Sequence, residues 1–81
     1  MTVKDTEGLD ILKDGVREVL KGLREESGLS QNKLARITGI DQSVISRFES
    51  GHGNEYSLAI VWKIADAFNL DVQIEFISRD D

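Results

Sequence analysis

The sequence predicts a mainly helical bundle of four to five short helices, followed by one C-terminal β-strand that pairs across a dimer. Two observations carry this prediction. Apolar residues recur at three- and four-residue steps over most of the chain, and no proline interrupts them. Only residues 71–77 change to apolar–polar alternation, the period of a strand. With 81 residues, we expect a single domain spanning residues 1–81. Its core is expected to be small, so oligomerisation would help to stabilise the fold.

The first predicted helix runs from Leu9 to Ser27. Its apolar side consists of Leu12, Val16, Val19, Leu20 and Leu23. A basic stripe on the same helix consists of Lys13, Arg17, Lys21 and Arg24. Gly28 ends the helix, because glycine readily adopts the left-handed conformation that follows a helix C-terminus.

Two short helices are predicted next, at residues 30–38 and 42–50. Each begins at a side chain that can cap it, Ser30 or Asp41, and each ends at a glycine, Gly39 or Gly51. The residues expected to face the core are Leu34, Ala35, Ile37, Ile40, Ile45 and Phe48. Two helices joined by a three-residue turn that contains glycine are typical of a helix-turn-helix, here at residues 30–50.

The last two predicted elements are a helix at residues 58–68, capped by Ser57, and a strand at residues 71–78. Alternation places Val72, Ile74 and Phe76 on one face of the strand. A lone strand leaves its backbone groups unpaired, and the sequence offers no second strand. We therefore expect the same strand of a second copy to pair with it antiparallel, which makes the protein a homodimer.

Composition excludes several classes of protein. The chain has no cysteine and one histidine, so we expect no disulfide, no metal site and no cofactor. Its longest apolar run, Leu58–Trp62, is too short to cross a bilayer, and the N-terminus lacks a signal core, which favours a cytoplasmic protein with no membrane partner. Nothing orients His52 toward a nucleophile, so we do not expect an enzyme.

The charge distribution is uneven. Residues 13–47 hold seven basic and five acidic residues, a net charge of +2, whereas the rest of the chain carries −7 and the whole chain −5. This asymmetry favours one face for a polyanion and an acidic remainder. A solvated surface of mixed charge would give the same count, so the observation alone does not separate the two interpretations.

One run of residues resembles a known family. Leu29-Ser30-Gln31, Leu34-Ala35, Gly39-Ile40, Ile45-Ser46, Glu49 and Gly51 have the identities and spacing of the XRE/Cro-repressor type of helix-turn-helix. The resemblance extends from about Arg24 to Leu70 and implies a lambda-repressor-like helical bundle that binds operator DNA, usually as a dimer. Two positions depart from the family pattern: Thr38 replaces a larger apolar residue, and Tyr56 stands where proline is frequent.

In such a motif the second helix enters the major groove and its N-terminal residues meet the base edges. The expected base contacts are Gln42, Ser43, Ser46 and Arg47. The expected phosphate contacts are Gln31, Lys33, Arg36 and Asn54, although Lys33 and Arg36 could be ordinary solvated charges. The resemblance also implies that Arg24 and Glu49 form a structural ion pair.

Three functions are compatible with these residues. The first is a sequence-specific transcriptional regulator, most simply a repressor, whose partner is double-stranded DNA. The second is an antitoxin that binds a protein toxin and regulates its own operon, because HipB-like antitoxins of this family resemble the predicted helices plus intersubunit strand. The third is a dimerisation scaffold that has lost DNA binding, which the polar residues 42, 43 and 47 disfavour.

Overall fold

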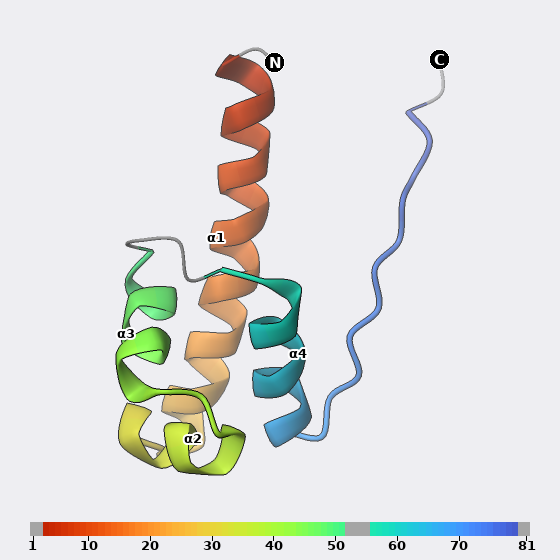
Figure 1. Cartoon of the computed structure of the whole chain (residues 1–81). Helices are drawn as coiled ribbons and strands as arrows, with labels where there is room; N and C mark the ends of the chain where they lie inside the picture. Colours follow the sequence, from red (N-terminus) through yellow and green to blue (C-terminus); the bar gives the residue numbers. More distant parts are fainter. Residues whose placement is uncertain (1–2, 52–55, 80–81) are drawn as a thin grey trace.

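The computed structural model describes residues 3–51 and 56–79 of the chain. This part of the chain contains four helices. They are α1 (Val3–Glu26), α2 (Gln31–Thr38), α3 (Gln42–Ser50) and α4 (Leu58–Ala67). In Figure 1, α1 runs along the whole molecule, and the three shorter helices gather around its C-terminal half. The predicted helical bundle is confirmed, with a first helix that begins earlier than the predicted Leu9.

The predicted capping residues fix where the short helices begin. The Ser30 hydroxyl accepts a hydrogen bond from the Lys33 N–H at 3.0 Å, and the Ser57 hydroxyl accepts one from Ile60 at 3.2 Å. The Asp41 carboxylate accepts the N–H of Ser43 at 3.3 Å. Each contact satisfies a backbone donor that the first turn of a helix leaves without a partner.

A residue in a left-handed backbone conformation follows each of the four described helices, and Gly28, with φ = 73°, follows α1 as predicted. Gly39 has φ = 78° and Gly51 has φ = 80°, which a side chain would strain. Asn69, with φ = 60°, follows α4 in the same way. Thr38, one of the departures from the family pattern, contributes to the turn: its hydroxyl donates to the Leu34 carbonyl at 2.8 Å and accepts from the Ile40 N–H at 3.2 Å.

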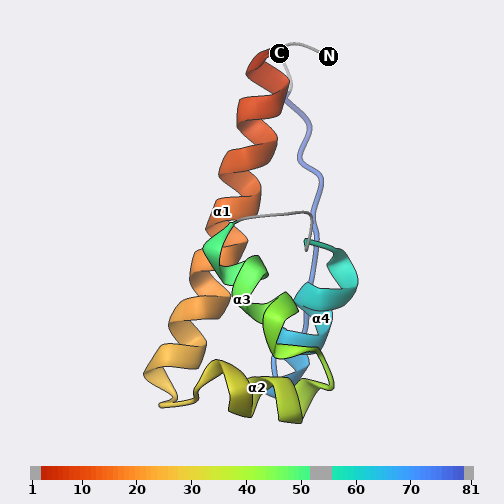
Figure 2. The same ribbon diagram turned by 60° about the vertical axis from the view of Figure 1, so that its left-hand side comes forward.

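The core lies where all four helices meet (Figure 2). α2 packs on α3 and α4, and α1 packs on α3 and α4. The buried cluster consists of Leu20, Leu34, Ile40, Ile45, Phe48, Val61 and Ile64. None of the described helices has the length and apolar character that crossing a bilayer requires.

Several residues on the predicted apolar sides of the helices are exposed. On α1, Leu12 and Val19 are 64% and 61% exposed, because the bundle covers only the side of the helix that carries Leu20. Ile37 on α2 is 51% exposed, so its expected place in the core was wrong, and Trp62 on α4 is 58% exposed in the single chain. The short helices are too few to cover every apolar side chain.

The basic residues of α1 do not all face solvent. Arg17 is buried, and its Nε donates to the Phe48 carbonyl at 2.6 Å near the end of α3. Its guanidinium also pairs with Asp14 and lies 5.7 Å from the centre of the Tyr56 ring, which packs on Phe48. Arg17 therefore ties α1 to the C-terminal end of α3, where a cation is favoured by the helix dipole.

Replacing Arg17 by methionine is expected to lower the free energy of unfolding by about 1–3 kcal/mol, since a charge-assisted hydrogen bond to a buried carbonyl is lost while the side-chain volume is kept. Urea denaturation measures this loss. Lys21→Met, on the same helix, is the matched control and should stay within about 0.5 kcal/mol of the unmodified chain. Equal losses in the two variants would contradict a specific role for Arg17.

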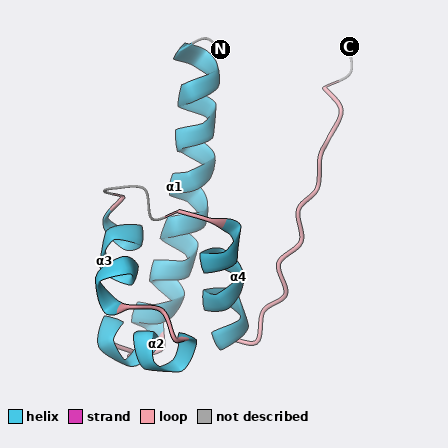
Figure 3. Cartoon of the chain, viewed as in Figure 1, coloured by secondary structure: helices cyan, strands magenta, loops and turns pink. Residues whose placement is uncertain are grey.

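Residues 71–79 form neither helix nor strand in the described chain, so the strand predicted at 71–78 is absent from the single protomer. Figure 3 shows this segment as an extended loop that leaves the bundle after α4 and runs roughly parallel to the axis of α1, apart from the helices. All of it is exposed, and Phe76 is 93% exposed. The physical reason is that a strand needs a partner for its backbone groups, and the described chain offers none.

Candidate nucleic-acid interface

The predicted base-reading residues lie on the first two turns of α3. Ser43 and Arg47 are exposed, while Gln42 and Ser46 are half-buried. Ile45 and Phe48 point the other way, into the core, and fix the rotation of the helix about its axis. The Ser43 hydroxyl also lies 3.3 Å from the Asp41 carboxylate, within the cap of the helix.

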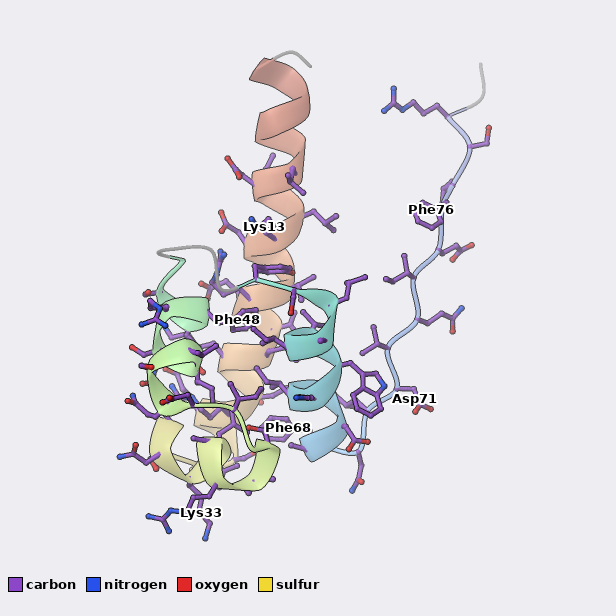
Figure 4. The ribbon with its side chains drawn as sticks, in the orientation of Figure 1. Lys13, Lys33, Phe48, Phe68, Asp71 and Phe76 are labelled. Atoms are coloured by element: carbon purple, nitrogen blue, oxygen red, sulfur yellow. The ribbon has the colours of Figure 1, made fainter. Side chains whose placement is uncertain are left out.

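The predicted phosphate-contacting residues lie on α2. Gln31 is its first residue and is half-buried, whereas Lys33 and Arg36 are exposed. Lys33 projects away from the bundle at the end formed by α2 (Figure 4). The start of a helix is favourable for an anion, because its first N–H groups are unpaired and its dipole is positive there. Asn54, the fourth predicted phosphate contact, and His52 lie outside the described residues.

Arg24 and Glu49 meet beneath this surface. Arg24 Nε donates to Glu49 Oε2 at 2.7 Å, and its Nη2 donates to Oε1 at 2.9 Å, which is a two-pronged pair. The side chains are only 11% and 5% exposed. Hydrogen bonding to Glu49 raises the pKa of Arg24 above its ordinary value, against the opposing effect of burial, so the arginine stays charged.

Two amide side chains extend this ion pair to the surface. Gln31 Nε2 donates to Glu49 Oε1 at 2.9 Å, and Gln42 Nε2 donates to Gln31 Oε1 at 2.9 Å. The hydrogen bonds therefore run from the half-buried Arg24, through the buried Glu49 and through Gln31, to a predicted base contact on α3. We call these four residues the amide relay.

The relay has only one possible direction. An ionised carboxylate accepts hydrogen bonds and donates none, so Gln31 must turn its NH₂ group toward Glu49. Its oxygen then faces Gln42, which must donate to it. Gln42 keeps its own oxygen and one N–H for a base edge, and Gln31 keeps one N–H for a phosphate. The buried carboxylate thus determines which polar atoms the surface presents.

The charge of this surface is positive. Lys33, Arg36 and Arg47 are exposed on α2 and α3, and Asp41 is the exposed acid among residues 30–50. Glu49 is neutralised by Arg24 beneath the surface. The two arginines of α1 do not contribute, because Arg17 is engaged with α3 and Arg24 with Glu49.

Two contacts were not predicted from the sequence: the hydrogen bond from Arg17 to the Phe48 carbonyl, and the hydrogen bond from Gln42 to Gln31. The second had a usable signal: the two glutamines are the first residues of consecutive helices, whose N-termini come together in a helix-turn-helix. The first had none, since arginines at helical spacing are usually solvated. Among the described residues, no three histidines or carboxylates gather in a way that could hold a metal ion.

Comparison with known proteins agrees with this geometry. A family model described as helix-turn-helix matches residues 20–74, which include all of α2, α3 and α4. A protein of Methanosphaerula palustris, provisionally named an HTH-type transcriptional regulatory protein, is 38% identical over 55 residues. These residues are 68% of this chain and 18% of that protein, so the chain spans less than a fifth of that relative's length.

Proposed function

This chain belongs to the helix-turn-helix family, of the XRE type, and on that premise we propose that it is a dimeric transcriptional repressor that reads a near-palindromic operator. The observation that carries the proposal is the surface of α2 and α3. It presents exposed cations beside polar side chains whose orientation is set from the core by the amide relay. A surface of this kind suits a polyanion with a hydrogen-bonding pattern, which is double-stranded DNA.

In the proposed complex α3 lies in the major groove. Gln42 offers an acceptor and a donor, the pair that adenine recognises, and Arg47 suits guanine. Ser43 and Ser46 contact either kind of base edge. Gln31, Lys33 and Arg36 hold the phosphates, with Asn54 as a further contact. Glu49 and Arg24 act as the structural ion pair below.

The proposed dimer uses the C-terminal segment. Val72, Ile74 and Phe76 alternate along it and are 39%, 55% and 93% exposed. Paired antiparallel with the same segment of a second copy, they would cover apolar surface in both protomers and satisfy the backbone groups of residues 71–78. A two-fold axis would also set two recognition helices about 34 Å apart, one turn of DNA. Light scattering that shows a folded monomer at low micromolar concentration would rule this dimer out.

An antitoxin is the second candidate function. The observation that favours it is the same extended segment, which is exposed, apolar on one face and acidic at Asp71 and Glu75, and so could bind a basic protein partner. A toxin-like reading frame beside the gene would support this function, and purification of the two gene products as a stable complex would establish it.

Selection of genomic fragments by the purified chain, with scrambled duplex as competitor, tests the proposed repressor. We expect one near-palindromic site to be retained, with affinity that falls steeply as salt rises. Arg47→Ala should lower operator affinity by about 1–3 kcal/mol and relax the preference at one base step, with a smaller effect on random duplex. No retention over competitor, or equal losses on both duplexes, would contradict base reading by α3.

A further inference from the structure

One face of α1 is apolar and exposed, on the side of the helix that the other helices leave uncovered. Ile11, Leu12 and Val19 are 73%, 64% and 61% exposed. With Gly15, Val16 and Leu20 they line a shallow groove. Residues 11, 12, 15 and 19 fall on one side of a helix, and none of them is charged, so covering this face removes no ion from water.

Three glycines share this face of α1. Gly8, Gly15 and Gly22 are seven residues apart, two turns of the helix. Glycine is the least favourable helix residue after proline, and a Cβ atom built on any of the three would meet nothing within 4 Å. Contacts within the chain therefore do not require glycine here, and the open space at the three glycines lets a second surface approach the backbone of the helix closely.

We propose that this face is an interface between two copies of the chain, in which α1 packs antiparallel on α1 of the partner. The pattern is complementary to itself. When Leu12 lies over Gly15 of the partner subunit, the same register places Val19 over Gly8 of the partner subunit. Both pairs are centred on one point, between residues 13 and 14, so a single two-fold axis generates all of these contacts. Two leucines and two valines would then each pack over a glycine of the other helix, in the open space that we call a glycine gap. A partner of unrelated sequence would not account for this coincidence of register.

The exposed area supports a second copy as the occupant. The chain exposes 6143 Å², whereas a compact monomer of 9.1 kDa exposes about 4,900 Å². The excess of about 1,200 Å² exceeds the ~800 Å² that each partner covers in a typical stable interface. Figures 1 and 2 show its two sources, the projecting half of α1 and the extended C-terminal segment. Antiparallel α1 helices would set each bundle beside the projecting end of the other helix.

The variant that tests this interface is Gly15→Leu in the full-length chain, followed by sedimentation equilibrium over a series of micromolar concentrations. The leucine fills one of the glycine gaps, so we expect the dissociation constant to rise at least tenfold. The same variant should unfold at a higher urea concentration when monomeric, because leucine favours the helix and meets no neighbour in the chain. Lys21→Leu, about 120° around the same helix, is the matched control and should leave association unchanged.

A parallel variant, Ile74→Pro, separates this interface from pairing of the C-terminal segments, because proline removes a backbone donor of the predicted strand. Weaker association in Gly15→Leu but not in Lys21→Leu supports the α1 interface, whatever Ile74→Pro does. The proposal is overturned if Gly15→Leu associates like the unmodified chain, or if the unmodified chain is a monomer throughout. Since no DNA is present, the outcome is independent of the proposed operator binding.

Discussion

Replacing Glu49 by alanine is expected to lower the free energy of unfolding by about 3–5 kcal/mol, the largest single effect that we predict for this chain. Arg24 would keep its charge in a site where its side chain is only 11% exposed, with its hydrogen-bonded carboxylate removed and only the more distant carboxylate of Glu25, at 3.9 Å, remaining. Gln31 would lose the acceptor for its NH₂ group as well. A domain of this size has little stability to spare, so the variant should be largely unfolded at 37 °C.

Urea denaturation, monitored by circular dichroism, measures this loss of stability. Two further variants show what causes it. Glu26→Ala removes an exposed glutamate of α1 and should change stability by no more than about 0.5 kcal/mol. The double variant Arg24→Met/Glu49→Met removes both charges and should regain most of the loss, since apolar side chains of similar size replace a buried ion pair well. A loss below about 1 kcal/mol in Glu49→Ala would show that solvent screens the pair.

The helices were predictable because their limits are set by local chemistry. Ser30, Asp41 and Ser57 cap helices where the sequence places them, and Gly39 and Gly51 take the left-handed conformations that end them. Each of these signals acts within one helical turn, so a single sequence suffices to read it. Within the motif at residues 30–50, Gln31, Gln42 and Ser43 lie on the first turns of α2 and α3, whereas Arg36 and Arg47 lie on the last turns.

The remaining features depend on contacts between distant segments. A period of 3.6 residues shows that α1 has an apolar side, but not how far the bundle extends over it, and so it did not show that Leu12 and Val19 are exposed. The role of Arg17 was not predictable, because its acceptor, the Phe48 carbonyl, lies 31 residues away in the chain. The C-terminal segment has the alternation of a strand, yet a strand is a property of a pair, and the described chain holds only one member.

Gln42→Glu is expected to lower operator affinity at least a hundredfold, about 3 kcal/mol. A carboxylate at this position has no donor for the oxygen of Gln31, which lies 2.9 Å from the present amide. Gln31 cannot turn over to offer its NH₂ group, because Glu49 already requires it. Two acceptors would therefore face each other beside the phosphates of the proposed complex. Gln42→Ala loses the base contact and the hydrogen bond to Gln31, but sets no acceptor against the Gln31 oxygen, and should cost about 1–3 kcal/mol.

The direction of the amide relay can be tested on the free protein, independently of DNA. Replacing Glu49 by glutamine gives position 49 an NH₂ group, so Gln31 could turn its oxygen inward and donate to a glutamate at position 42. Glu49→Gln should therefore cost less stability in the Gln42→Glu background than in the unmodified chain, with a coupling energy of about 0.5–3 kcal/mol. Urea denaturation of the two single variants and the double variant measures it. Strict additivity would show that Gln31 turns freely, and the buried carboxylate would then not set the pattern of donors and acceptors on α3.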